Sequence, residues 1–171
     1  MAWLYRLKRD LEQDIPTPVS EQPDRPSISS LNYFQDDTEI SYLDTADIAA
    51  RPSQAIADKL VEDYFQAIHP SFPIVGKALF LSQYRAFYST RTVRPGKRWI
   101  AILNLVFAIA AKHLVLVANE PHEYGDHLVY FARAWRLSVD KVALLDHPNL
   151  QQVQVEGLSA FYLLSIGHVN R

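Results

Sequence analysis

Residues 64–75, which read YFQAIHPSFPIV, constrain the fold of this chain more than any other segment. Pro70 and Pro73 lack a backbone N–H, and each disfavours helical geometry in the residue before it. A helix that enters this segment must therefore end near His69. Apolar side chains nevertheless continue beyond that point, at Phe72, Ile74 and Val75. We expect a non-helical elbow that is packed against a hydrophobic core rather than left as a solvated loop.

The segment before the elbow has the pattern of an amphipathic helix. Ser53 is suited to cap its first turn, and one face carries the apolar residues Ile56, Leu60, Val61, Tyr64, Phe65 and Ile68. Charged and amide side chains occupy the other faces, as expected for a helix that lies on a core. The sequence therefore predicts a helix over residues 53–68.

Two further helices are predicted after the elbow. The first covers residues 77–88, and its expected inward residues are Leu79, Phe80, Tyr84 and Phe87. A loop over residues 92–98 contains the helix-breaking pair Pro95 and Gly96. The second helix, residues 99–118, reads WIAILNLVFAIAAKHLVLVA and is apolar on nearly every face. Such a helix is typical of the centre of a helical core.

The last third of the chain predicts two more helices. One begins after the cap residue Asp126, and its expected inward stripe is Leu128, Phe131, Ala132, Trp135, Val139 and Val142. The other covers residues 150–166 and follows a break at residues 147–149. No segment alternates usefully with the period of a strand. The fold class is therefore all-α, an irregular multi-helix domain with about five core helices.

The first fifty residues have a different character. Residues 1–14 place three leucines on one stripe and predict a short amphipathic helix. Residues 15–50 predict a Pro-rich linker followed by an acidic and aromatic segment. That segment is either of the activation type or a strap that lies over a groove. We expect this disordered or strap-like part to precede a folded domain over residues 51–171.

Composition excludes several classes of site. The chain has no cysteine, which excludes disulfides, cysteine nucleophiles and thiolate metal sites within it. Its net charge of −2 provides no general attraction to nucleic acid. Residues 99–118 are long enough to span a bilayer. Asn104, Lys112 and His113 interrupt this segment, so we interpret it as a buried core helix and keep a membrane span as an alternative.

Histidines offer the only motif that looks like a metal site. His122 and His127 are the first and last residues of the sequence HEYGDH. They are five residues apart, whereas the histidines of a helical zinc-protease motif are four apart, and on a helix they would point about 140° apart. We interpret them as polar residues at a helix start. His69, beside Pro70, is expected to be a hydrogen-bonded structural residue. No nucleophile motif or phosphate-binding loop accompanies these residues, so the chain has no candidate catalytic site.

A basic run precedes the long apolar helix, at Arg91, Arg94, Lys97 and Arg98. Such a run can act in nuclear localisation or bind phosphate groups. The alternative, which we prefer, is a solvated loop whose cations face nearby carboxylates.

Six short motifs occur in order along the folded part: LVEDYF at 60–65, HPSFPIV at 69–75, FLSQY at 80–84, WIAILNLVFA at 99–108, ARA at 132–134 and GLSAFYLL at 157–164. Together they resemble the fungal-specific transcription factor domain. This is the middle homology, or regulatory, region of zinc binuclear cluster transcription factors of the xylanolytic-activator type. The resemblance covers residues 53–171 and implies packing roles for Tyr64, Phe65, His69, Pro70, Phe72, Pro73, Ile74, Phe80 and Tyr84.

The resemblance implies a non-catalytic regulator of transcription in the nucleus, controlled through ligand, partner or intramolecular contacts. Family members bind DNA through an N-terminal six-cysteine cluster that holds two zinc ions, which this chain lacks because it has no cysteine. We therefore expect no cofactor in this chain, and DNA contact only through a cluster outside it.

The family domain also continues beyond a segment like residues 167–171. The resemblance thus implies a fragment that holds the front part of the domain, truncated at its C-terminus. Its last helix would then expose apolar surface and mediate self-association or contacts with protein partners.

A small helical ligand-binding protein or enzyme is the competing interpretation. It would require a pocket in which polar groups such as His69, His113 and Tyr64 converge, rather than an apolar interior.

Overall fold

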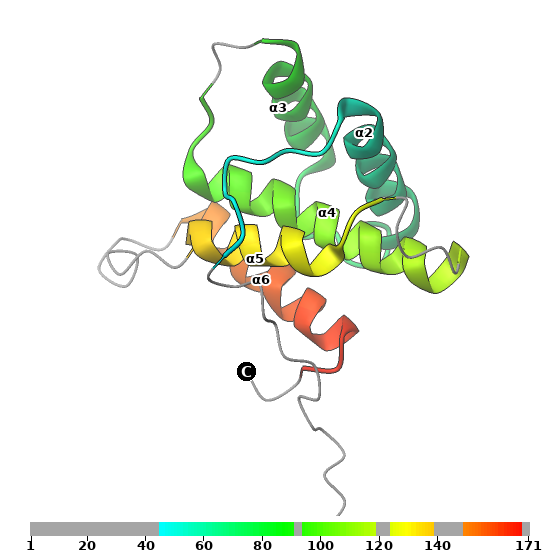
Figure 1. Cartoon of the computed structure of the whole chain (residues 1–171). Helices are drawn as coiled ribbons and strands as arrows, with labels where there is room; N and C mark the ends of the chain where they lie inside the picture. Colours follow the sequence, from blue (N-terminus) through cyan, green and yellow to red (C-terminus); the bar gives the residue numbers. More distant parts are fainter. Residues whose placement is uncertain (1–44, 91–93, 119–123, 139–148, 169–171) are drawn as a thin grey trace, which may run out of the picture. The chain divides into compact units, whose positions relative to one another are not determined.

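The computed structural model describes residues 45–90, 94–118, 124–138 and 149–168, and these residues contain helices and connecting segments but no strand. The α-helices are α2 (Gln54–Asp63), α3 (Lys77–Ser89), α4 (Lys97–Ala118), α5 (His127–Ser138) and α6 (Leu150–Ser165), with one turn of π-helix, η2 (Tyr64–Ile68), after α2 (Figure 1). The prediction of an all-α fold with about five core helices is confirmed. The predicted helix over residues 1–14 lies outside the described residues.

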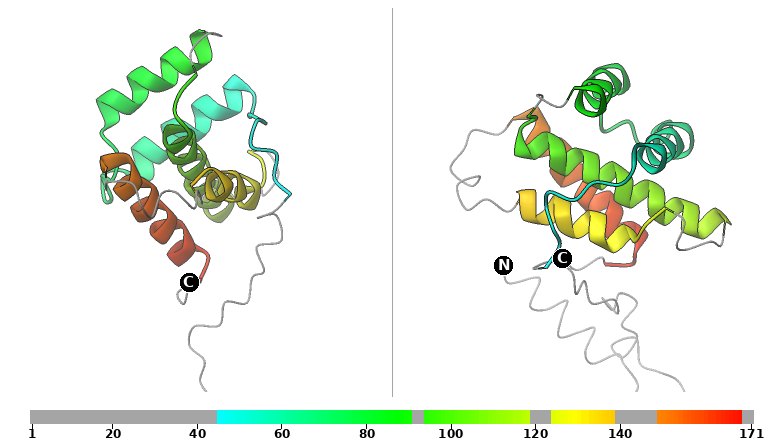
Figure 2. Two further views of the ribbon diagram at one scale, coloured as in Figure 1. Left: turned by 90° about the vertical axis from the view of Figure 1, so that its left-hand side faces the viewer. Right: turned by 45° about the horizontal axis from the view of Figure 1, so that its top comes forward.

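Helix α4 is the centre of this helical part. It packs against α2 and η2 and against α5 and α6, and the views show α2 and α3 on one side of α4 with α5 and α6 on the other (Figures 1 and 2). Every residue from 101 to 111 is buried. By length and composition α4 alone among the described helices could cross a membrane. Because residues 101–111 are buried by neighbouring helices, and His113 bonds to Asp63 of α2, the structure favours the core-helix interpretation.

Local capping signals set several helix boundaries, as the sequence predicts. The hydroxyl of Ser53 accepts a hydrogen bond from the backbone N–H of Ile56 at 3.4 Å, and the carboxylate of Asp126 accepts one from Leu128 at 2.8 Å. Asn149 caps α6 in the same way. These bonds satisfy backbone donors that have no partner within the helix. The predicted loop over residues 92–98 is too long by two residues, because α4 begins at Lys97.

The helix that enters the elbow does not keep regular α geometry to its end. Its last turn, η2, is a π-helix in which the backbone N–H of His69 donates to the carbonyl of Tyr64, five residues earlier. The wider turn brings Tyr64, Phe65 and Ile68 all to the buried side. The sequence predicts helix over these residues but carries no signal for this wider turn.

Two aromatic or aliphatic side chains predicted to face inward are on the surface. Leu79 of α3 is 66% exposed and Trp135 of α5 is 41% exposed. On α3 the buried face consists of Phe80, Tyr84 and Phe87, and Leu79 lies about 100° away from Phe80 around the helix axis. The apolar stripe predicted for α3 was therefore too wide. The expected inward residues Val139 and Val142 lie outside the described residues.

Residues 45–53 run from α5 across α4 to the start of α2 (Figures 1 and 2). The segment is held at its start, where Ala46 is buried and its carbonyl accepts a hydrogen bond from the guanidinium of Arg136 on α5. This is the course of a strap. Residues 31–44 lie outside the described residues, so the strap interpretation of the whole acidic segment stays a prediction.

Candidate functional site

The elbow is tied to the core through its backbone carbonyls. The Nε2–H of His69 donates to the carbonyl of Val75 at 2.9 Å, and the side-chain amide of Gln154 on α6 donates to the carbonyl of Ile74 at 3.2 Å. The ring of His69 also packs on Phe65, with centroids 4.9 Å apart. His69 is thus a hydrogen-bonded structural residue. It donates to the carbonyl of Val75, which lies outside any helix and therefore has no helical hydrogen-bond donor.

The structure divides the nine expected packing residues into three groups. Four of them are buried, namely Tyr64, Phe65, Phe80 and Tyr84. His69 and Ile74 are half-buried. The exposed group consists of Pro70, Phe72 and Pro73. The expectation that the elbow is pinned on the core is therefore wrong for its first half: Phe72 is 50% exposed and packs only at the rim, on Phe161 of α6 with centroids 4.7 Å apart.

Two hydrogen-bonded pairs of polar side chains join helices at the edge of the core. The hydroxyl of Tyr84 on α3 donates to Asp58 on α2 at 2.6 Å, and His113 on α4 lies 2.9 Å from Asp63 on α2. Each bond joins two helices that are far apart in the sequence. Burial, and then the hydrogen bond to Asp58, raise the pKa of Tyr84, so its hydroxyl remains a donor at neutral pH.

A third pair joins α5 to α6. Nδ1 of His127 lies 2.7 Å from the hydroxyl of Tyr162, which is fully buried and stacked on Phe131 with centroids 4.4 Å apart. Burial, and to a lesser degree the positive charge of Lys112, lower the pKa of His127. The ring is therefore held neutral between the two helices rather than exposed as an acid or a base.

The three polar groups of the competing interpretation do not converge in the described part of the chain. Tyr64 and His69 are neighbours, with ring centroids 6.2 Å apart, but His113 is paired with Asp63 on the surface of α2 and α4. None of these three side chains lines either of the two cavities described below. The described residues also contain no group of three histidine, aspartate or glutamate side chains that could hold a metal ion.

The basic run is split by the structure. Lys97 and Arg98 belong to the first turn of α4, and Arg94 is an exposed residue of the preceding loop. Arg91 lies outside the described residues, as does His122 of the HEYGDH motif. The interpretation of the run as one solvated loop is therefore wrong at its C-terminal end, where the two cations start a helix.

An apolar surface lies along α6. Leu150, Val153 and Leu164 are each more than half exposed, and Ala160 is exposed between them. These positions are three, seven or four residues apart and so share one face of the helix. Glu156 is the only charged residue in α6. The opposite face, with Val155, Leu158 and Tyr162, packs into the core.

A shallow groove extends this surface towards α3. It has a volume of about 90 Å³ and lies between the elbow, α3 and the start of α6, with Leu79, Gln83, Leu150 and Gln154 in its wall. Leu79, which the sequence predicted to be buried, thus contributes to the same apolar surface as Leu150. We call the exposed side chains of Leu79, Leu150, Val153, Ala160 and Leu164 the α6 surface.

Sequence reasoning missed the pairs that join the helices. Asp58 was assigned to the solvent face of its helix, and only the tertiary structure brings Tyr84 to it. Likewise nothing in the sequence indicated that His127 would meet Tyr162. The cap at Asp126 did give a signal for the start of α5, and this start fixes the position of His127 at the first residue of the helix.

Comparison with known proteins finds fungal transcription regulators. Transcription regulator galc of Aspergillus niger is 36% identical over 189 aligned positions that span 100% of this chain and 23% of the relative. Sorbicillinoid biosynthetic cluster transcription factor 2 of Penicillium rubens is 33% identical over 117 positions, which cover 66% of this chain and 17% of that protein. The acetamidase regulatory protein of Emericella nidulans is 49% identical over 39 positions, 23% of this chain and 5% of the relative.

The chain spans less than a quarter of the length of these curated relatives. No family model matches the sequence, and no solved structure matches it. The homologues are thus regulators of transcription, and the similarity concerns one part of each of them.

Proposed function

We propose that this chain, a homologue of fungal transcription regulators, is a regulatory module of the middle homology type, the fungal-specific transcription factor domain. The observation that carries the proposal is similarity along the whole chain to one such regulator. The helical core agrees with it, because the motifs around residues 60–84 supply the buried residues that join α2, α3 and α4. The module acts in the nucleus by contacts with protein and has no catalytic role.

Three polar groups of the core and the elbow support a non-catalytic role. The buried hydroxyls of Tyr84 and Tyr162 are engaged with Asp58 and His127, and burial raises the pKa of both tyrosines. His69 is engaged by a backbone carbonyl. A general base or nucleophile needs a free lone pair directed at substrate. These groups instead hold helices together.

We propose that contact with DNA is made through a zinc cluster outside this chain. The sequence has no cysteine, so it cannot supply the thiolate ligands of such a cluster. The module itself then needs no cofactor. Its contribution is to control the activity of the factor to which it belongs.

We infer that the α6 surface is where a second copy of this chain packs. The exposed residues are arranged nearly symmetrically about Gly157, so antiparallel packing of two α6 helices pairs Leu150 with Leu164 and Val153 with Ala160. The small exposed residue Ala160 lets a second helix approach closely, whereas Gly157 lies under Ile74 of the elbow. Helix α6 also carries only one charged residue to desolvate. A twofold arrangement of this kind is the commonest in soluble oligomers.

A reporter assay in a fungal host tests the regulatory role. The whole chain is placed between a heterologous DNA-binding domain and a constitutive activation domain, and an unrelated helical domain of similar size serves as the spacer control. We expect the intact chain to change reporter output relative to the spacer. Leu158→Asp, which places a charge at a fully buried position of α6, should abolish that change.

Equal reporter output from the intact chain and the spacer would contradict the proposal, provided that both fusions reach the nucleus in equal amounts. Nuclear amounts are measured by immunoblot of fractionated cells.

A further inference from the structure

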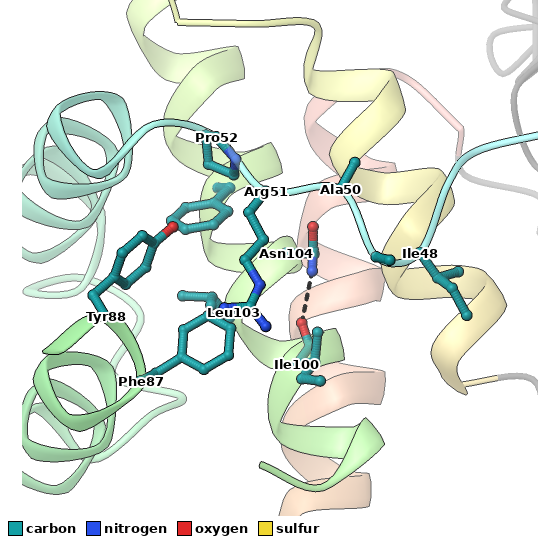
Figure 3. Close-up of a pocket in the computed structure, with 11 residues that line it drawn as sticks. Ile48, Ala50, Arg51, Pro52, Phe87, Tyr88, Ile100, Leu103 and Asn104 are labelled. Carbon is teal, nitrogen blue, oxygen red and sulfur yellow. Dashed lines mark hydrogen bonds between the residues drawn. The ribbon is translucent and has the colours of Figure 1, made fainter. Parts of the chain in front are cut away.

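A cavity lies beneath residues 48–52, where this segment crosses α4. Its volume is about 140 Å³, and its walls are the crossing segment, Phe87 and Tyr88 of α3, and the α4 side chains Ile100, Leu103, Asn104 and Phe107 (Figure 3). An apolar cavity of about 150 Å³ is large enough to hold a benzene molecule. The space is therefore suited to a ligand of that size.

Polar groups of this cavity are mostly hydrogen-bond donors. Among the described residues that line it, only Arg51 carries a charge, and no described carboxylate forms an ion pair with it. The guanidinium of Arg51 is stacked on the ring of Phe87, 4.1 Å from its centroid (Figure 3). The stacking holds the guanidinium at the edge of the cavity while leaving its N–H groups free to bind an acceptor.

The hydroxyl of Tyr88 is the second donor. Its oxygen is buried and has no hydrogen-bond partner among the described residues. Burial raises the pKa of Tyr88 to about 12, so the group is a protonated donor at neutral pH. A buried hydroxyl without an acceptor is unfavourable, because it has lost its hydrogen bonds to water without replacing them. An acceptor in the cavity would remove this penalty.

The amide of Asn104 completes the polar part of the wall. Its Nδ2 donates to the carbonyl of Ile100 one turn earlier at 2.9 Å, and the amide oxygen points away from that bond (Figure 3). Asn104 is 6% exposed. It therefore places a fixed amide dipole beside the space that Phe87 and Leu103 otherwise make apolar.

We propose that this cavity binds a small monocarboxylic acid, whose carboxylate accepts hydrogen bonds from Arg51 and Tyr88 and whose benzene-sized body lies against Phe87 and Leu103. A guanidinium and a hydroxyl match the planar, bidentate carboxylate group. A single cation with apolar walls does not match a phosphate group, which carries more charge. As a ligand site the cavity rests on its own geometry, whereas its use as an effector site rests on the proposed function.

The experiment uses the full chain and benzoate as the probe, followed by two-dimensional NMR titration. We expect saturable shifts of the backbone amide signals of residues 48–51; Pro52 has no amide proton. Three other probes should each bind more weakly than benzoate. These are benzyl alcohol, which lacks the charge, acetate, which lacks the ring, and inorganic phosphate. Arg51→Gln should weaken benzoate binding about tenfold or more, because it removes a charge-assisted hydrogen bond.

Matched variants separate binding from folding. Arg85→Gln removes an exposed arginine of α3 that does not line the cavity and should leave benzoate affinity unchanged. Tyr88→Phe should weaken benzoate binding without lowering the stability of the unliganded chain, because its hydroxyl has no partner to lose.

The inference is overturned if benzoate does not bind in a saturable way to folded chain, or if Arg51→Gln binds it as well as the parent chain. Benzoate binding that leaves reporter output unchanged would instead support the site and contradict its use as an effector site. The proposed function fails separately, when the intact chain and the spacer give equal reporter output.

Discussion

Helices α4 and α6 are both rich in apolar residues, yet the structure buries one on nearly every side and the other on one side only. All residues from 101 to 111 of α4 are buried, because α2 and η2 lie on one side of it and α5 and α6 on the other. In α6, Val155, Leu158 and Tyr162 are buried, whereas Leu150 and Leu164 are exposed. The number of neighbouring helices therefore decides which apolar side chains of each helix are buried: Leu150 and Leu164 of α6 are as apolar as the leucines of α4, but no described helix covers them.

This difference in burial implies different roles for α4 and α6. Helix α4 contributes stability, since its apolar area is removed from water on folding. The exposed side of α6 contributes little to the stability of the monomer and is free to contribute to association. The following predictions compare the two helices by the same kinds of substitution.

The largest effect is expected for Leu105→Ala in α4. Leu105 is fully buried, so removing its side chain should lower the free energy of unfolding by about 2–5 kcal/mol. Urea denaturation followed by circular dichroism measures this change. Leu164→Ala removes the same atoms from α6, where Leu164 is 60% exposed, and should change the free energy by less than about 0.5 kcal/mol. If both substitutions lowered the free energy of unfolding equally in dilute protein, the contrast between α4 and α6 would be wrong.

A smaller loss is expected for Tyr162→Phe, which tests the buried side of α6. The change removes the hydroxyl bonded to His127 and should lower the free energy of unfolding by about 1–3 kcal/mol, because it leaves a polar atom without its partner. Tyr88→Phe is the matched control, since its hydroxyl has no partner to lose. A greater loss for Tyr88→Phe than for Tyr162→Phe would show that the assignment of the two hydroxyls is wrong.

The third prediction concerns association through the α6 surface. Leu164→Gln should raise the dissociation constant of the homodimer about tenfold or more, because the substitution occurs twice in a twofold interface. Sedimentation velocity over a range of protein concentrations measures this constant. Leu116→Gln, an exposed leucine near the end of α4, is the matched control and should leave it unchanged. A parent chain that stays monomeric at all concentrations would rule out the second copy as the partner.

The smallest effect is a dependence of stability on pH that comes from His127. Burial lowers the pKa of His127 in the folded state below its unfolded value of about 6.5. Below that pH the unfolded chain therefore binds a proton that the folded chain does not, and the free energy of unfolding falls as the pH decreases. Urea denaturation at pH 7.5 and 5.5 should show a smaller fall for His127→Gln than for the parent chain. An unchanged or larger fall would contradict a neutral His127.

Local signals in the sequence predicted much of the secondary structure. Proline at position 70 ends the first helical segment as expected, and Ser53 and Asp126 cap the helices that they precede. These predictions succeeded because a cap or a proline acts on backbone groups within a few residues of itself. The start of α4 was predicted two residues late, since two cations at a helix start carry no favourable signal.

The candidate sites were harder to predict. The aromatic residues of the 60–84 motifs could be assigned to packing, but Phe72 and Leu79 were expected inside and lie on the surface. The cavity beneath residues 48–52 combines Arg51 with Tyr88 and Asn104, which are far apart in the sequence. Its walls form only when residues 48–52, α3 and α4 have packed together.

The sequence by itself determined that this chain is all-α, where most of its helices begin and end, and that it cannot hold a cysteine-bound metal. The resemblance had also implied that the last helix exposes apolar surface, as α6 does. Only the tertiary structure decided that α4 is enclosed, which residues of α6 form its exposed face and that Tyr84 meets Asp58. The physical reason is that helical periodicity reports only how side chains are arranged around their own axis. Whether a given face is buried depends on which other helices reach it, and in this chain those helices come from distant parts of the sequence.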